Sequence, residues 1–315
     1  MALLVVLLAL AALRGPDLFT AGGMAGAISV ATPLILATLA LTPIAIAGRG
    51  GVDLAVGPVL VFVNVTVIHW LVANDITSPL AIIPFALAVG IVVQLIQGLA
   101  IAVLRLQPVV VTLSGFLVFA GLDLVILSKP GGEAPGWLAS WGAGTDLLSP
   151  ALLVLLGALV AWALIARSTL FRNIRLMGSN ERTAYASGIQ LIPTRLGAHA
   201  IAGVFVGLAG LMYTALIASG DPTQGDTYTL IAVTALVLGG TSLAGGLGGG
   251  LGSVMGAIDL FLISYVLSTF DFGSSTAFVV QLTYGLVLVC ALAFGSLVTI
   301  VVARRRTWRA AGAQA

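Results

Sequence analysis

Residues 24–47 read MAGAISVATPLILATLALTPIAIA, a run of 24 residues without a charged side chain. A membrane-spanning helix needs about 20 predominantly apolar residues to cross the hydrocarbon core of a bilayer. The strands of a membrane β-barrel alternate polar and apolar residues, whereas this run is continuous. We therefore expect residues 24–47 to form a transmembrane helix.

The rest of the chain has the same character. Of its 315 residues, 60% are apolar and only 8% are charged, against about 25% charged residues in a soluble domain. So few charges could not keep the surface of a soluble globule of this size hydrated. The composition excludes a soluble enzyme, a nucleic-acid-binding protein and a disulfide-stabilised scaffold.

Ten apolar segments follow one another along the chain, separated by polar breaks. They are 1–13, 24–47, 53–73, 79–104, 108–128, 149–166, 196–218, 228–241, 249–269 and 276–301. The first has no basic residue before it, so we interpret it as a first span rather than a secretory signal. The run 228–241 is short enough for a half-span. We predict one all-helical transmembrane domain over residues 1–315 with about ten spans.

Basic residues predict the orientation of these spans, because they collect in cytoplasmic loops. When the breaks are assigned alternately, with the N-terminus inside, 11 of the 13 basic residues fall inside, and only Arg14 and Lys129 fall outside. The inner ones are Arg49, Arg105, Arg167, Arg172, Arg175, Arg182, Arg195, Arg304, Arg305, Arg306 and Arg309. The pattern predicts an even number of spans with both termini, including Ala315, in the cytoplasm.

The longest inner loop, residues 167–195, contains a short segment with helical propensity. Ser179 or Asn180 can cap its start by accepting free backbone N–H groups. Gly188 can end it in the left-handed conformation that glycine tolerates. We expect a short polar helix near the membrane, which is either an ordinary solvated element or a docking helix for a cytoplasmic partner.

Small residues at helical spacing predict close helix packing. Gly203 and Gly207 form one such pair, and Gly248, Gly252 and Gly256 form another series. A phosphate-binding loop is excluded by the lysine content: the only lysine, Lys129, precedes Pro130, whereas an ATPase loop needs Gly-Lys-Ser/Thr. If ATP drives this protein, another chain must hydrolyse it.

Three segments closely resemble sequences of the ribose-type ABC sugar permeases, the membrane subunits of binding-protein-dependent sugar importers. The first reads GSNERTA at 178–184 and continues as SGI at 187–189, the second reads GGVDLAVG at 50–57, and the third runs from DPT at 221–223 to VLGGTSLAGG at 237–246. The stretch 97–113 resembles the family more loosely. The resemblance covers roughly residues 24 to 300.

The resemblance implies the permease subunit of an ABC importer in the bacterial inner membrane, moving a sugar or sugar-like solute by alternating access. It implies a second permease subunit, cytoplasmic ATPase subunits and a periplasmic sugar-binding protein as partners, with membrane lipid around them. The residues it assigns to ATPase coupling are Gly178, Ser179, Asn180, Glu181, Arg182, Thr183, Ala184, Gly188 and Ile189. Those it assigns to structural motifs are Gly51, Asp53, Gly57, Gly239, Gly240, Thr241, Gly245 and Gly246.

Departures from the family pattern leave the assembly open between a homodimer and a heterodimer with a second, different permease. They include Leu247 in place of a basic residue, Gly197 in place of another, Ser264-Tyr265 in place of paired asparagines and Gln97 in place of asparagine. The sugar itself is not identified by the sequence.

Polar side chains inside apolar segments are the candidates for the translocation path, since they are costly in a membrane unless paired or functional. They are Asn64, Gln94, Gln97 and Asp259. Hydrogen bonding between helices is the alternative for the amides. For Asp259 the alternatives are structural pairing and snorkelling to the membrane interface. Asp53 is expected to cap a helix that starts at Leu54.

Three other functions are alternatives to a sugar permease. A relative in the same superfamily could carry a nucleoside or a branched-chain amino acid, and an ion-coupled secondary transporter would use intramembrane ionisable groups such as Asp259. A membrane enzyme would need a catalytic or metal-binding constellation. With one cysteine, Cys290, and two distant histidines, His69 and His199, we expect no catalytic residues, metal site or cofactor.

Overall fold

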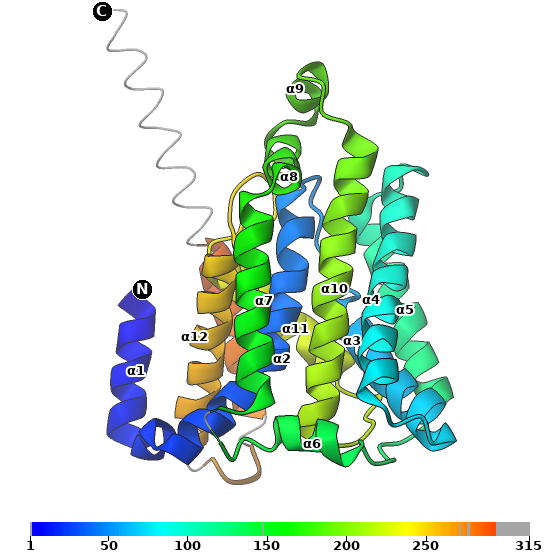
Figure 1. The fold of residues 1–315 in the computed structure, drawn as a ribbon. Coiled ribbons are helices and arrows are strands. Elements are labelled where there is room, and N and C mark those ends of the chain that lie inside the picture. The colour runs from blue at the N-terminus through cyan, green and yellow to red at the C-terminus, as the bar shows by residue number, and fades with distance from the viewer. Residues whose placement is uncertain (1, 147, 271, 276–277, 294–315) are drawn as a thin grey trace, which may run out of the picture.

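The computed structural model describes residues 2–146, 148–270, 272–275 and 278–293, and within them the chain forms a bundle of helices (Figure 1). The helices are α1 (Ala2–Arg14), α2 (Ala21–Ile46), α3 (Val56–Thr66), α4 (Pro79–Ala102), α5 (Pro108–Ile126), α6 (Gly136–Gly142), α7 (Pro150–Arg167), α8 (Thr169–Ser179), α9 (Glu181–Ala186), α10 (Leu191–Ile217), α11 (Gly225–Leu238), α12 (Gly250–Ser268) and a last helix, Phe278–Ala293. Turns of π and 3-10 helix extend α3 to Asn74.

Seven helices in the described part of the chain are long and apolar enough to cross a membrane. They are α2, α3 with its extension, α4, α5, α7, α10 and α12. Three shorter apolar helices, Leu3–Arg14, Gly225–Leu238 and Phe278–Ala293, occupy the other predicted segments. The all-helical prediction is confirmed, and a helix lies in each of the ten apolar segments.

Three of the long helices begin at proline: Pro79, Pro108 and Pro150 are the first residues of α4, α5 and α7. Proline suits this position because the first helical N–H has no partner within the helix, and because its fixed φ matches the helix. Ser78, Gln107 and Ser149 precede these prolines in extended conformation, as the residue before proline prefers. The polar breaks therefore contain the start signals of the spans that follow them.

The bundle centre is α10, which lies between α4, α2 and α3 (Figure 1). Glycines permit this closeness: a Cβ on Gly203 would lie 2.5 Å from Cα of Ile91, and one on Gly207 would lie 2.7 Å from the carbonyl oxygen of Ala86. The predicted packing role of Gly203 and Gly207 is confirmed. In the second series, Gly252 and Gly256 lie close against Gly239 and Ala235 at the end of α11, whereas Gly248, with φ of +124°, lies in the turn before α12 and packs on Thr241, so its predicted place on the helix face is wrong.

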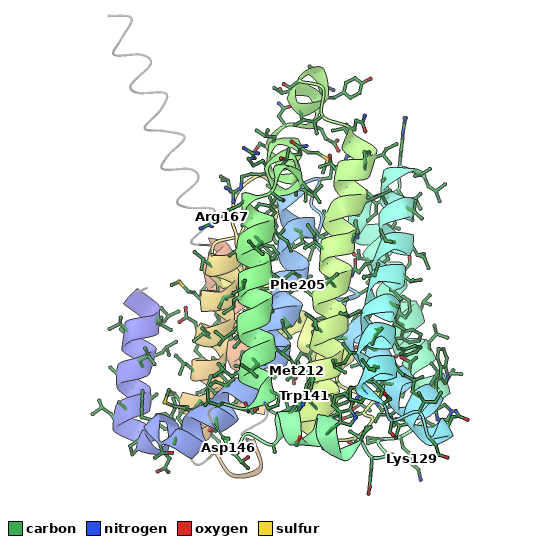
Figure 2. The ribbon with its side chains drawn as sticks, viewed as in Figure 1. Lys129, Trp141, Asp146, Arg167, Phe205 and Met212 are labelled. Carbon is green, nitrogen blue, oxygen red and sulfur yellow. The ribbon has the colours of Figure 1, made fainter. Side chains whose placement is uncertain are left out.

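The inner and outer breaks of the sequence prediction lie at opposite ends of the bundle. Figure 2 shows Arg167 at the end that carries α8 and α9, and Lys129 and Asp146 at the other end, where α6 lies. The N-terminal end of α1 points towards the α8–α9 end in Figure 1. Residues 304–315, which contain four of the arginines used for the orientation, lie outside the described residues.

Several helix bounds differ from the prediction. The helix after Asp53 begins at Val56 rather than at Leu54, and its N-cap is Ala55, which makes no side-chain cap. α10 begins at Leu191, five residues before the predicted apolar run. Helix α6 in the outer loop and helix α8 in the inner loop were not predicted.

Candidate functional site

The inner loop folds into two helices, each with its own start signal. Ser168 caps α8 by accepting a hydrogen bond from the backbone N–H of Phe171 at 3.1 Å. Asn180 caps α9, its side-chain oxygen accepting from the N–H of Thr183 at 3.0 Å. These bonds satisfy donors that have no partner within a helix. The predicted cap at Asn180 is confirmed.

Helix α9 ends as predicted, at a glycine in the left-handed region. Gly188 has φ of +85°. Its N–H donates to the carbonyl of Tyr185 at 2.9 Å, and that of Ile189 donates to the carbonyl of Ala184 at 3.1 Å. This pair of bonds is a Schellman motif, which satisfies the last carbonyls of a helix. With both ends fixed, the six-residue helix projects from the bundle as a defined element (Figure 1).

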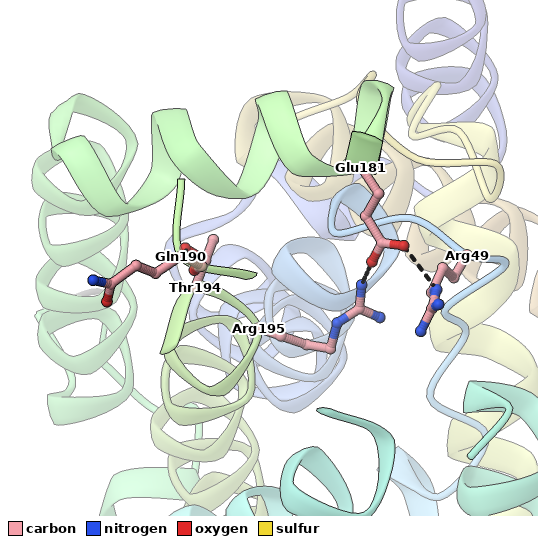
Figure 3. A network of polar contacts seen from close by, with 5 residues as sticks. All are labelled: Arg49, Glu181, Gln190, Thr194 and Arg195. Carbon is pink, nitrogen blue, oxygen red and sulfur yellow. Dashed lines mark hydrogen bonds and ion pairs between the residues drawn. The ribbon is translucent and has the colours of Figure 1, made fainter. Parts of the chain in front are cut away.

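An ion-pair network holds α9 to the bundle (Figure 3). One carboxylate oxygen of Glu181 lies 3.0 Å from Nε of Arg49, and the other accepts a hydrogen bond from Arg195 near the start of α10. The Arg195 side chain is 6% exposed, against 47% for Arg49, so the bond to Arg195 is the less screened of the two. Glu181 therefore joins three segments at the inner end.

A contact among glycines, which we call the glycine junction, brings together three segments distant in sequence: Gly48, Gly178 and Gly245-Gly246. A Cβ on Gly48 would lie 2.9 Å from Cα of Gly178, and one on Gly245 would lie 2.7 Å from the carbonyl oxygen of Gly178. The N–H of Gly246 donates to the carbonyl of Ile46 at 2.9 Å. Both Gly245 and Gly246 have positive φ, +104° and +74°. Two of the segments that resemble the permease family, 178–184 and 237–246, thus meet in one place, and the third, 50–57, begins two residues after Gly48.

The remaining motif residues of 239–241 pack on α12. Gly239 lies against Gly252 too closely for a side chain on either, and Gly240 has φ of +79°. The hydroxyl oxygen of Thr241 lies 3.5 Å from that of Ser253, which in turn lies 2.7 Å from the hydroxyl of Thr42 on α2. The turn after α11 is thereby attached to α12 and α2.

Asp53 lies in the segment between α2 and α3. It was expected to cap a helix that starts at Leu54, but the N-cap of α3 is Ala55. Its Oδ1 accepts from the N–H of Ala55 at 2.9 Å, and its Oδ2 accepts from Nε2 of Gln94 on α4 at 2.5 Å. Burial raises the pKa of Asp53 to about 6, against the hydrogen bonds from Gln94 and Ala55, which lower it. Asp53 therefore orients the chain where α3 begins.

On the opposite side, two threonines hold the same segment. The hydroxyl of Thr112 on α5 donates to the carbonyl of Val52 at 2.9 Å. Thr229 on α11 accepts from the N–H of Gly57 at 3.1 Å, and its oxygen lies 3.1 Å from the carbonyl oxygen of Leu54. A side chain at Gly57 would overlap the carbonyl of Gly225. The starts of the short helix α11 and of α3 therefore lie against each other.

The structure does not bring the four candidate path residues together. Asn64 on α3 binds Thr214 and the backbone of Ser219 and Asp221, each at 2.9 Å, towards the outer end. Gln94 is fully buried and bound to Asp53 and His199. Asn64 and Gln94 thus have hydrogen-bond partners within the chain.

The other two candidates have unused hydrogen-bonding capacity. The amide of Gln97 is buried without a partner among the described residues, close to Gly115. Asp259 lies midway along α12, is 6% exposed, and has one carboxylate oxygen without a partner among the described residues. A path role remains a prediction for all four.

A polar groove opens beside α9 at the inner end. It has a volume of about 540 Å³. Its lining consists of four apolar residues and six polar or charged ones, Arg49, Arg105, Glu181, Tyr185, Gln190 and Arg195. Tyr185, 72% exposed, stands at its edge. The ion pairs of Arg49 and Arg195 with Glu181 were not predicted, because no residue close to either arginine in the chain indicates this partner.

A bundle of long apolar helices with one structured, charged end is typical of a multi-pass membrane protein. The family model described as "Branched-chain amino acid transport system / permease component" matches residues 23–292. The chain belongs to this permease family, and the resemblance noted from the sequence is confirmed.

Similar proteins are named for sugar transport. The ribose import permease protein of Escherichia coli strain K12 is 29% identical over 264 residues, covering 82% of this chain and 81% of that protein. The D-allose transport system permease protein of the same strain is 30% identical, covering 66% and 64%. The galactose/methyl galactoside import permease protein of Escherichia coli strain K12 is 28% identical, covering 71% of this chain and 71% of that protein.

Proposed function

We propose that this chain is the transmembrane permease subunit of an ATP-driven ABC importer for a sugar or sugar-like solute. The observation that carries the proposal is the contact between two family-like segments, 178–184 and 237–246, at the glycine junction next to the start of α9, with Gly48 two residues before the third. An ATPase subunit docks on α8 and α9, and a periplasmic sugar-binding protein delivers the solute at the opposite end. ATP hydrolysis belongs to the partner chain.

The transport cycle is alternating access in a dimer of permease subunits, identical or different. A partner that binds two states of the bundle with different affinity shifts the equilibrium between them. Small movements at α9 can become rearrangements of packed helices, because packed interfaces switch between discrete arrangements. The sugar names of the similar proteins favour a sugar over a nucleoside or a branched-chain amino acid.

The decisive experiment is uptake into proteoliposomes. The chain is reconstituted with a candidate ABC ATPase and a candidate sugar-binding protein, and radiolabelled ribose, allose, galactose, leucine and a nucleoside are offered in turn. We expect one sugar to accumulate only when ATP and a catalytically intact ATPase are present. Accumulation by the chain alone, driven by an ion gradient and abolished by Asp259→Asn, would show a secondary transporter instead.

The topology that goes with this proposal has ten spans in a bacterial inner membrane, with α9 and both termini in the cytoplasm. In a Cys290→Ala background, Tyr185→Cys and Leu148→Cys place single thiols at residues that are 72% and 82% exposed at opposite ends. A membrane-impermeant maleimide added to intact cells should label position 148 and leave position 185 unlabelled until the cells are lysed. The reverse pattern would invert the topology.

A further inference from the structure

A chain of buried hydrogen bonds crosses the inner half of the bundle. Nδ1 of His199 on α10 lies 3.1 Å from Oε1 of Gln94 on α4. The other end of the Gln94 amide donates to Asp53, which itself accepts from the N–H of Ala55. All three side chains are at most 2% exposed. The chain of bonds therefore leads from α10, through α4, to the residue just before α3.

Each end of this chain lies four residues from an arginine that pairs with Glu181. Arg195 precedes His199 by four residues on α10, so the two lie on the same helix face. Arg49 precedes Asp53 by four residues along the segment between α2 and α3. Because Glu181 pairs with both arginines, these contacts and the backbone stretches 195–199 and 49–53 together form a closed ring through α9, α10, α4 and that segment.

The ring reaches well below the end of the bundle. Gln94 lies eight residues before the end of α4, and His199 lies eight residues after the start of α10. At 1.5 Å per residue, each is about 12 Å along its helix from the inner end. A buried polar network is tolerated only when its groups are satisfied, and a satisfied network fixes the elements it joins. The amide of Gln94 uses one donor and one acceptor in this way.

We propose that Gln94 and His199 are positioning residues that carry the position of α9 to the first turn of α3. The proposal rests on the proposed function for the origin of the movement, which is the binding of a cytoplasmic partner at α9. A shift of Glu181 displaces Arg195 and the start of α10. His199 and Gln94 pass this displacement to Asp53, and so to the backbone that begins α3.

The receiving end of the ring is a place where a small displacement has a large effect. Thr229 of α11 binds the backbone at Gly57 and contacts that of Leu54, so that two short helices start against each other. A change in the direction of the segment before Val56 alters how these two helix starts meet. Hinges commonly lie at such element ends, where a few residues absorb the change in backbone angles.

Amide hydrogen exchange on the purified full chain, in lipid nanodiscs, tests this proposal. The reporters are the hydrogen-bonded amides of Gly51, Val52, Ala55 and Gly57. We expect Gln94→Met to raise their exchange rates about tenfold, the effect of losing one or two hydrogen bonds. His199→Leu should do the same, whereas His199→Asn keeps a side-chain N–H donor near the position of Nδ1 and should stay near the original rates.

A second experiment tests whether a change at Glu181 reaches α3 through Gln94. It uses a variant without the ion pair between Arg49 and Glu181, which joins α9 directly to the segment before α3. In an Arg49→Gln background, Glu181→Gln should still accelerate exchange at these amides, and adding Gln94→Met should abolish that further effect, because both changes break the same path. If Glu181→Gln has no effect in this background, or has the same effect with Gln94→Met present, the proposal is overturned. Should Gln94→Met fail to fold, His199→Leu takes its place in the comparison.

The control variant is Thr38→Val. Thr38 is fully buried in α2, and among the described residues its hydroxyl donates to the carbonyl of Leu34 within its own helix and to no other group. We expect it to leave exchange at residues 51–57 unchanged, and equal acceleration there would mean that the reporters follow general destabilisation, which overturns the proposal. The measurement uses neither substrate nor ATPase, so its failure is distinguishable from a failure of the uptake assay.

Discussion

Gly178 lies against the backbone of Gly245, so closely that a Cβ on Gly245 would be 2.7 Å from the carbonyl oxygen of Gly178. The contact joins the end of α8 to the turn that follows α11, over a separation of 67 residues (245 − 178). Gly48 completes it from the end of α2. Backbone contacts therefore fix the inner end of the bundle, and they leave no room for a side chain at these three glycines.

Gly178→Ala should destabilise the chain strongly, because its Cβ would overlap the carbonyl oxygen of Ile46. We expect a loss of about 2–3 kcal/mol, the range of overpacking in a tight core, read as a lower midpoint of thermal unfolding in detergent. Gly157→Ala on α7 is the matched control, because nothing lies within 4 Å of its Cβ. It should be neutral or stabilising by up to about 1 kcal/mol. Similar midpoints for the two variants would contradict the glycine junction.

Arg195→Gln should cost more stability than Arg49→Gln. Both changes remove an ion pair with Glu181, but the Arg195 side chain is 6% exposed and that of Arg49 is 47% exposed. A hydrogen bond to a charged group contributes about 1.5–3 kcal/mol when protected, and an exposed pair contributes about 0–1 kcal/mol. Thermal unfolding of the two variants in the same detergent measures the difference. Equal losses would show that burial does not separate the two pairs.

Asn180→Ala should loosen α9 while leaving the bundle folded, because the lost cap contributes about 1 kcal/mol to a helix of only six residues. In the reconstituted importer this should lower uptake per ATP hydrolysed, since the docking element is no longer fixed. Asn180→Asp retains a capping oxygen and should restore coupling. Full coupling in Asn180→Ala would argue that the shape of α9 is unimportant.

Two of the three amides proposed for the path, Asn64 and Gln97, should behave differently on removal. Asn64 makes three hydrogen bonds to groups near the outer end, and Asn64→Ala should lower stability by about 2–4 kcal/mol by leaving buried groups unpaired. Gln97→Leu removes a buried amide with no partner among the described residues, so it should cost little or add stability. If Gln97 contacts the solute, Gln97→Leu should lose uptake while its unfolding midpoint stays unchanged. The uptake assay and thermal unfolding together detect this combination.

Much of this fold can be predicted from the sequence because its signals are local. Continuous apolar runs mark the helices, Asn180 and Gly188 mark the ends of α9 through their own side-chain and backbone chemistry, and the glycine spacing on α10 marks a close helix contact. Each of these follows from residues within a few positions of one another, where helix geometry fixes what can touch.

The features that were missed depend on partners far away in the chain. Glu181 pairs with Arg49, which lies in a loop 132 residues earlier in the chain (181 − 49). Gln94 is predicted for the solute path because the sequence around Asp53 and His199 does not indicate that they are its hydrogen-bond partners. Polar residues in an apolar helix look alike in sequence whether they face a cavity or another helix. Only the packing of α4 against α10 and the segment before α3 decides between them.

Stability should depend on pH through Asp53, whose pKa is raised by burial to about 6 from its ordinary value of 3.8. The folded state holds this proton more tightly than the unfolded state, so the stability it contributes is fully present below about pH 4 and is lost as the pH rises through 6. Asp53→Asn should flatten the dependence of the unfolding midpoint on pH between 4 and 6. The slope is the readout, because replacing a carboxylate oxygen by an amide also disturbs the bond from Gln94 and changes the absolute midpoint. An identical slope in the variant would assign the dependence to other groups.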